Sequence, residues 1–160
     1  IVAKTPDIQV LNDLQAALVW AGKNGGDLKR VGVTGFCWGG RITWLYAAHQ
    51  AKVKAATAWY GKLVGNNTEL TPKHPLELAA ELKAPVLGLY GGADTGIPMD
   101  SVVKMQSALA QKPNSGNSLI HVYPDTPHAF HADYRATYRE GPAKNGWEKC
   151  IAWFKKMGVA

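Results

Sequence analysis

The segment between residues 31 and 44 holds a cysteine in a position suited to covalent chemistry. Its sequence, VGVTGFCWGGRITW, places Cys37 after a β-branched run and before a helical pattern. The letters GFCWGG match the nucleophile-elbow pattern G-x-[nucleophile]-x-G, with cysteine in place of serine. Such an elbow is a strained turn that sets the sulfur at a helix N-terminus, which favours the thiolate. The pattern predicts a nucleophilic Cys37, and it predicts that side chains at Gly35 and Gly39 would collide with the turn.

The same motif allows other interpretations. A lone GxCxG also fits a tight turn around a buried thiol, and its glycines superficially suggest a phosphate loop. The segment lacks both the GK[ST] of a P-loop and the GxGxxG of a dinucleotide site, so we set phosphate binding aside. In an elbow, the N–H of Trp38 points to where an oxyanion would form.

Partners for the cysteine follow in the order nucleophile, acid, base. Asp94 lies in the Gly-rich stretch YGGADTGIP, and His128 lies in the later stretch PHAFH. Both follow predicted strands, and open α/β sheets place their sites at the carboxyl ends of strands. We prefer His128 to the competing His131 because it is nearer the strand end. Three other residues are less favoured as the acid or the base. Asp100 is better explained as a charge in the first turn of a helix, Asp125 as a turn former, and His121 lies within a predicted strand.

The elements that must position these residues alternate along the chain. A helix is expected over 5–23, with Thr5 as its N-cap and Pro6 at its first position. Strands are expected over 30–35, 53–61, 85–92 and 118–124, and helices over 40–50, 76–82, 99–111 and 143–158, with long loops over 61–75 and 124–142. This alternation predicts an α/β fold with a parallel sheet and right-handed crossovers. Residues 86–90 are nearly all apolar, which is typical of a strand covered on both faces.

Several aromatic and sulfur side chains are assigned to the core or to a pocket. In the last helix, Cys150 falls on one face with Trp147, Ile151 and Phe154, which predicts a core cysteine. Core positions are also expected for Trp44 and Trp59. Trp38 and Tyr60 sit near strand ends, where they could line an apolar pocket.

Composition limits the classes of function. The chain has 160 residues, 46% hydrophobic and 19% charged, which suits one domain, residues 1–160, with a real core. The net charge of +6 is scattered, which favours anionic ligands and argues against nucleic acid. No apolar run suits a membrane span, and the start lacks the features of a signal peptide. Two cysteines and five histidines show no metal-site spacing, and no cofactor motif occurs. We therefore expect a cytoplasmic protein, or a periplasmic one if an N-terminal leader is missing.

The motifs GFCWGG, YGGADTGIP and PHAFHADYR, with AWYG before them, resemble those of the dienelactone hydrolase family. The resemblance covers nearly the whole chain and implies an α/β-hydrolase fold. It implies that Cys37 is the nucleophile, His128 the general base and acid, and Asp94 the orienting carboxylate. It further implies cleavage of small lactones or esters through a thioester acyl-enzyme, without a cofactor.

The chain also departs from the family pattern. Family members begin with further strands and helices, which by the resemblance carry a second oxyanion donor, a glutamate near the cysteine and a substrate-binding arginine. Ala132 stands where some members have arginine, and Arg135, Arg139 or Arg41 could substitute. We therefore expect a C-terminal portion of the fold with an exposed sheet edge, together with a homodimer, a missing N-terminal segment or a marginally stable fold.

Two other functions remain open on these grounds. A general carboxylesterase or thioesterase would show the same three residues. A non-catalytic fragment could use Cys37 as a redox-sensitive thiol. Burst acylation by an activated ester distinguishes a hydrolase from such a switch.

Overall fold

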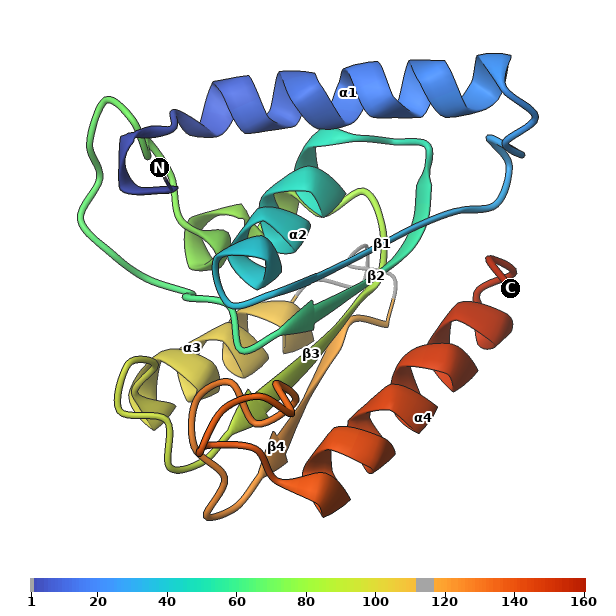
Figure 1. Cartoon of the computed structure of the whole chain (residues 1–160). Coiled ribbons are helices and arrows are strands. Elements are labelled where there is room, and N and C mark those ends of the chain that lie inside the picture. Colours follow the sequence, from blue (N-terminus) through green and yellow to red (C-terminus); the bar gives the residue numbers. More distant parts are fainter. Residues whose placement is uncertain (1, 112–116) are drawn as a thin grey trace.

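The computed structural model describes residues 2–111 and 117–160. Its centre is a sheet of parallel strands that follow one another in chain order: β1 (Val31–Phe36), β2 (Val53–Trp59), β3 (Val86–Gly91) and β4 (Leu119–Tyr123) (Figure 1). Three of the strands lie within predicted strand segments, β1 extends one residue beyond its predicted end at 35, and the parallel α/β architecture is confirmed. Every strand therefore ends at the same side of the sheet, where the loops carrying the candidate residues begin.

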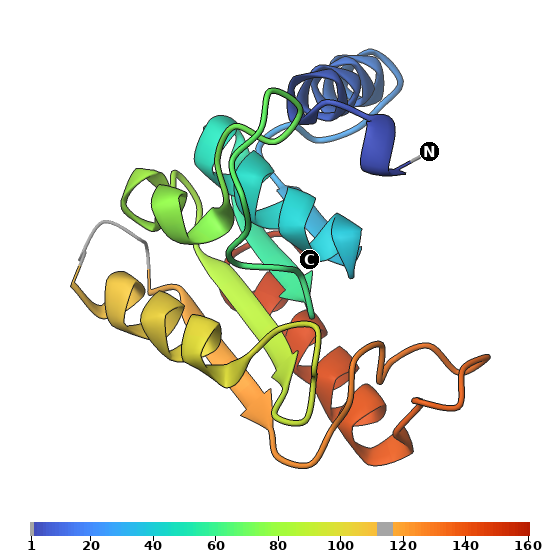
Figure 2. The ribbon, with the colours of Figure 1, turned by 90° about the vertical axis from the view of Figure 1, so that its left-hand side faces the viewer.

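Helices cover both faces of the sheet (Figures 1 and 2). The helices α2 (Trp38–His49) and α3 (Met99–Ala110) and the 3-10 turn η2 (Pro75–Glu81) share one face, and α4 (Glu140–Lys156) covers the other. The helix α1 (Asp7–Lys23) follows a short 3-10 turn, η1 (Val2–Lys4), and packs on α2 on the side away from the sheet (Figure 1).

The core lies where α2 and α4 meet the two central strands. All residues of β3 are buried, as its apolar sequence predicted. Trp44 and Trp59 are completely buried, which confirms their core assignment. Trp44 Nε1 donates to the hydroxyl of Tyr90 at 3.0 Å, and that hydroxyl donates to the carbonyl of Gly61 at 2.9 Å. These bonds satisfy the polar atoms of two large core residues and tie α2 to the end of β2.

Several boundaries and one buried face differ from the prediction. The helix α4 begins at Glu140 rather than at residue 143, and the helix expected over 76–82 is the 3-10 helix η2. The helix α1 begins at Asp7, with Pro6 outside it as the N-cap residue. The helix α2 begins directly at Trp38 rather than at residue 40, because the turn is completed within Cys37 itself. Trp147 was expected on the buried face of α4 but is 47% exposed, whereas Cys150 is buried as predicted. The buried face instead passes through Gly146, which has no side chain to keep α4 away from the ring of Trp59.

The edge of the sheet formed by β1 is open in the described part of the chain. There β1 pairs with β2 only, and its residues alternate between half-buried and exposed, with Phe36 39% exposed at its end. This matches the exposed edge expected from the sequence. Within residues 2–111 and 117–160, no helix combines the length and apolar character needed to cross a membrane.

Candidate active site

The turn between β1 and α2 holds Cys37 in a strained conformation. Its backbone has φ 55° and ψ −115°, in the left-handed region that residues other than glycine rarely adopt. Its N–H donates to the carbonyl of Trp59 at 2.9 Å, which ties the turn to the neighbouring strand. The side chain is exposed. The residue thus has the backbone geometry of a nucleophile elbow, with the sulfur at the N-terminus of α2.

The glycines around the turn differ in how closely they are packed. A Cβ on Gly35 would lie 2.3 Å from the carbonyl oxygen of Gly39, and a Cβ on Gly40 would lie 2.4 Å from that of Trp59. Gly39 itself faces open space, with nothing within 4 Å of the position that a Cβ would take, so the predicted collision there is wrong. The residue that must be glycine after the cysteine is Gly40, because α2 approaches the backbone of β2 at that point.

We expect Gly35→Ala to destabilise the protein by about 1–3 kcal/mol or more, since the new methyl group meets backbone that cannot move aside cheaply. Gly39→Ala is the matched control, and we expect it to be neutral or to stabilise by up to about 1 kcal/mol as a helix substitution. Urea unfolding followed by circular dichroism measures both. Equal stabilities for the two variants would contradict this account of the turn.

Side chains from three distant loops meet at the sulfur. His128 Nε2 lies 3.2 Å from Cys37 Sγ, and His128 Nδ1 lies 2.6 Å from Asp94 Oδ2. His128, Cys37 and Asp94 follow β4, β1 and β3 respectively, so they lie at the carboxyl ends of parallel strands. The structure brings together the three residues that the sequence analysis preferred.

The carboxylate of Asp94 has both of its oxygens engaged. Its side chain is completely buried. While Oδ2 contacts His128, Oδ1 accepts the N–H groups of Gly96 at 2.8 Å and Ile97 at 3.1 Å. The hydrogen bond to Asp94 is the largest cause that raises the pKa of His128, which reaches about 9 although partial burial opposes the change. The contact with Cys37 raises it further. Asp94 therefore favours a proton on Nδ1 and stabilises the imidazolium.

The alternative residues lie elsewhere. The ring of His131 packs against Trp59, with 4.6 Å between centroids, and against Phe36 at 5.1 Å. His121 packs edge-on against a tyrosine of β4. Asp100 is exposed in the first turn of α3, where it pairs with a lysine one turn later, and Asp125 is exposed at a turn with φ 54°. Both aspartates have the local roles that the sequence analysis gave them.

A cavity of about 490 Å³ opens beside the sulfur. Its lining includes Cys37, Trp38, Tyr60, Lys62 and His128. As the first residue of α2, Trp38 has an N–H with no acceptor inside the helix, so this group is available at the cavity. Tyr60 is buried, and its ring lies edge-on against His128 at 5.1 Å. A larger aromatic-lined hollow of about 800 Å³ shares Tyr60 with this cavity.

The three arginines suggested for substrate binding are placed differently. Arg139 is exposed, and its guanidinium donates to two backbone carbonyls of its own loop, those of Ala136 and Tyr138. Arg41 borders the cavity, but its guanidinium is buried and forms two hydrogen bonds with Asp7, at 2.6 and 2.8 Å. The charge of Arg41 is therefore already paired, and we do not propose this residue as a binding group for the substrate. Arg135 is exposed beside the ring of Tyr134, at 5.6 Å from its centroid. Burial raises the pKa of Tyr60, and the nearby charge of Arg135 is a smaller effect that lowers it.

Sequence reasoning did not single out the partners of Arg41, which are Asp7 and His74. No local sequence pattern marks these two residues, because they lie 34 and 33 residues from Arg41.

Within residues 2–111 and 117–160, no group of three or more His, Cys, Asp or Glu side chains is arranged to hold a metal ion.

Comparison with known proteins shows which family this chain is similar to. Residues 1–158 match the model of the dienelactone hydrolase family. A Salmonella typhimurium protein with the provisional name carboxymethylenebutenolidase is 56% identical over 158 residues, which are 99% of this chain and 58% of that protein. A Methylorubrum extorquens protein with the same provisional name is 54% identical, over 100% of this chain and 55% of its own length. The chain thus spans less than two thirds of these relatives.

Solved structures agree on the fold. A crystal structure from Klebsiella pneumoniae, provisionally named a dienelactone hydrolase, has a TM-score of 0.93 and 55% identity, over 97% of this chain and 64% of that one. A puromycin-hydrolyzing peptidase from Mycobacterium tuberculosis has a TM-score of 0.75 at 19% identity, over 94% of this chain and 26% of its own. The second likeness concerns the fold alone. Together with the parallel sheet, the first confirms the α/β-hydrolase type of fold.

Proposed function

Because the chain belongs to the dienelactone hydrolase family, we propose that it carries the nucleophile, base and acid of a hydrolase that cleaves small lactones or esters. The observation that carries the proposal is the continuous contact from Cys37 Sγ to His128 at 3.2 Å and from His128 to Asp94 at 2.6 Å. Neighbouring nucleophile and base, with the base oriented by a third group, form the arrangement that activates a thiol.

In the proposed reaction, His128 takes the proton from Cys37, and the thiolate attacks the substrate carbonyl. Asp94 holds the imidazole tautomer and stabilises the imidazolium. The tetrahedral intermediate collapses to a thioester as His128 protonates the leaving alkoxide, which is the opened ring in a lactone. A water that gives its proton to His128 then attacks the thioester, releasing the carboxylic acid and the free thiol.

Trp38 is the proposed oxyanion donor, through its backbone N–H at the start of α2. Tyr60 forms part of the pocket wall, and Arg135 is the residue that we propose to bind a substrate anion. Removing one donor from an oxyanion hole lowers rates by about 10²–10³-fold, so activity depends strongly on how many donors reach the oxyanion. A second donor is expected from the resemblance, in a segment that the family carries before the part matched here.

The test is acylation of this chain by an activated ester such as p-nitrophenyl acetate. We expect a burst of p-nitrophenol and a mass increase of one acetyl group on the peptide containing Cys37, followed by slow turnover. A chain that loses its free thiol to peroxide but gives neither burst nor acyl adduct would instead be a redox-sensitive thiol protein.

The pH dependence of turnover provides a separate prediction. The general base must be neutral, and the pKa of His128 is raised from 6.5 to about 9, mainly by its hydrogen bond to Asp94. We therefore expect the steady-state rate to rise with pH and to level off with a midpoint above 6.5, because the imidazole loses its proton only as the pH approaches its raised pKa. Stopped-flow rates corrected for hydroxide hydrolysis measure this profile. A rate independent of pH between about pH 6 and about pH 10 would contradict a histidine base.

A further inference from the structure

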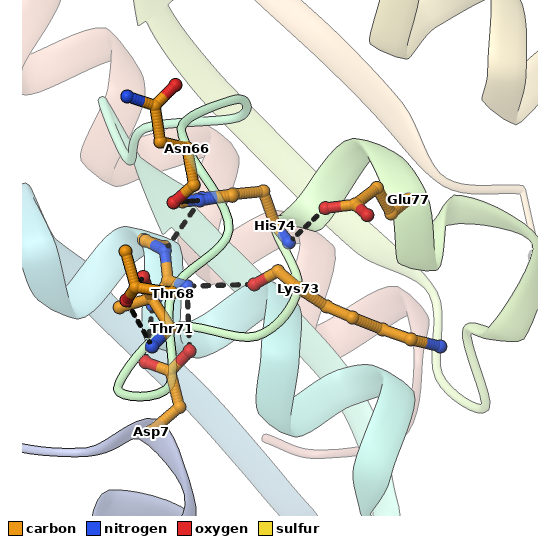
Figure 3. Close-up of polar contacts among 8 residues, drawn as sticks. Asp7, Asn66, Thr68, Thr71, Lys73, His74 and Glu77 are labelled. Carbon is orange, nitrogen blue, oxygen red and sulfur yellow. Dashed lines mark hydrogen bonds and ion pairs between the residues drawn. The ribbon is translucent and has the colours of Figure 1, made fainter.

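Asp7, Arg41 and His74 form a buried polar cluster, and Figure 3 shows Asp7 and His74 with their polar contacts. Arg41 also lines the cavity beside the sulfur, so the cluster lies next to the candidate active site. Arg41 holds both carboxylate oxygens of Asp7, and the two side chains are only 5% and 7% exposed. Arg41 Nε also donates to His74 Nδ1 at 3.4 Å, and Nη2 donates to the carbonyl of Lys73 at 2.9 Å. Since Nδ1 accepts, Nε2 of His74 carries the hydrogen and donates to the carbonyl of Asn66 at 3.1 Å.

This cluster joins both ends of the loop over residues 61–74. The loop begins at Gly61, two residues after the end of β2, where a Cβ would lie 2.3 Å from the backbone nitrogen of Arg41. It returns at residues 73 and 74 to the guanidinium of the same arginine. The N–H of Asp7 donates to the carbonyl of Leu70 at 2.8 Å, which adds a third attachment. Arg41 therefore contacts the start of the loop through its backbone and the end of the loop through its side chain.

The start of this loop is also a wall of the cavity beside the sulfur. Tyr60 and Lys62, on either side of Gly61, line that cavity together with Cys37. Arg41 is one helical turn after the cysteine, and its N–H donates to the carbonyl of Cys37 at 3.1 Å. A change in how Arg41 is held would alter the spacing between the helix that carries the sulfur and the wall that faces it.

We infer that Arg41, held by Asp7 and His74, is a positioning residue that sets the distance between the 60–62 wall and the nucleophile, and so determines how tightly an ester substrate is bound. This inference rests on the proposed function. A displacement of about 1 Å in an active site can lower kcat/KM by about 10²-fold, so a small shift of the wall is enough to be measured.

The main variants are Asp7→Asn and a paired apolar replacement, Asp7→Leu with Arg41→Met. Asp7→Asn is isosteric and leaves the guanidinium without its counter-charge. The apolar pair removes both buried charges, a replacement that is often neutral or stabilising, and it also removes the donors to Lys73 and His74. The control is Glu81→Gln, which breaks an exposed ion pair with Lys73, at 3.0 Å, at the same end of the loop.

We expect KM for the activated ester to rise about tenfold in Asp7→Asn and in the apolar pair, with kcat per acylated site changed less than about threefold, and no change in Glu81→Gln. Active-site titration counts only the protein that can be acylated, and so corrects for unfolded protein. If the cluster merely stabilised the fold, the variants would lower the titrated fraction and leave KM unchanged. Hydrogen exchange should become faster at the amides of residues 61–74 but not in β2 or β3.

The outcomes separate the two proposals. Wild-type KM and wild-type exchange in Asp7→Asn would overturn the positioning role, as would a stable apolar pair with wild-type KM. If the apolar pair does not fold, the KM and the hydrogen exchange of Asp7→Asn decide whether the cluster has the positioning role. If the wild-type protein is never acylated at Cys37, the proposed function fails. Hydrogen exchange at the amides of residues 61–74 in Asp7→Asn then still shows whether the cluster holds the loop. Exchange unchanged from that of the wild-type protein would overturn this role of the cluster.

Discussion

Replacing Cys37 with alanine should abolish both the acylation burst and the steady-state hydrolysis of an activated ester. The expected fall in kcat is about 10⁶-fold, the order of magnitude seen when the nucleophile of a serine protease is removed. The physical reason is that the variant lacks the only exposed cysteine thiol in the chain, the one that lies 3.2 Å from an imidazole nitrogen. Without it, no covalent intermediate divides the reaction into two easier steps.

The chain offers a matched control for this variant. Cys150 is its other cysteine, buried in α4, where burial raises its pKa above the ordinary range. Cys150→Ala should retain the burst amplitude and the single acyl adduct on Cys37. Mass spectrometry of the acylated protein, quenched within the burst, locates the adduct. A burst that survives Cys37→Ala, or that disappears in Cys150→Ala, would remove Cys37 from its proposed role.

Asp94→Asn should lower kcat by about 10⁴-fold although it changes a single atom, by analogy with the same substitution in a serine hydrolase. Oδ1 of Asp94 accepts the N–H groups of Gly96 and Ile97, so the amide oxygen of the asparagine must take that position. The amide NH₂ then faces His128 Nδ1, which has to become an acceptor. The imidazole proton moves to Nε2 and faces the sulfur, so the ring cannot accept the proton of the thiol.

Asp125→Asn is the control for this substitution. Asp125 precedes His128 in the same loop, is exposed, and has a φ of 54° that asparagine tolerates. We expect unchanged kcat for this variant. Nitrogen chemical shifts of the His128 ring report the tautomer directly, and in Asp94→Asn the proton should be found on Nε2. A proton that stays on Nδ1, or a kcat within about tenfold of the wild-type value, would contradict the orienting role of Asp94.

Local patterns were sufficient for much of this site. The elbow could be predicted because a β-branched run, a glycine-flanked cysteine and a helical pattern are adjacent in the chain. The places of Asp94 and His128 could be predicted because each follows a strand, and parallel strands end on one side of a sheet. The preference for His128 over His131 had a weaker basis, and it was the packing of His131 against Trp59 and Phe36 that separated them.

Predictions that depended on contacts between distant segments were less successful. Arg41 was suggested for substrate binding as a substitute for the arginine that some family members carry at the position of Ala132. Its pairing with Asp7 depends on how α1 packs on α2, which the local pattern does not specify. The same holds for Gly39 and Gly40: both look alike in the sequence, but only Gly40 approaches β2 closely.

By itself, the sequence determined the order of strands and helices, the parallel sheet and the residue types available for chemistry at its edge. These follow from short-range periodicity and from the turn that glycine allows on either side of a cysteine. The tertiary structure alone decided how Arg41 is held. Its hydrogen bonds with Asp7 and His74 join groups 34 and 33 residues apart and form only at distances set by the packing of whole elements.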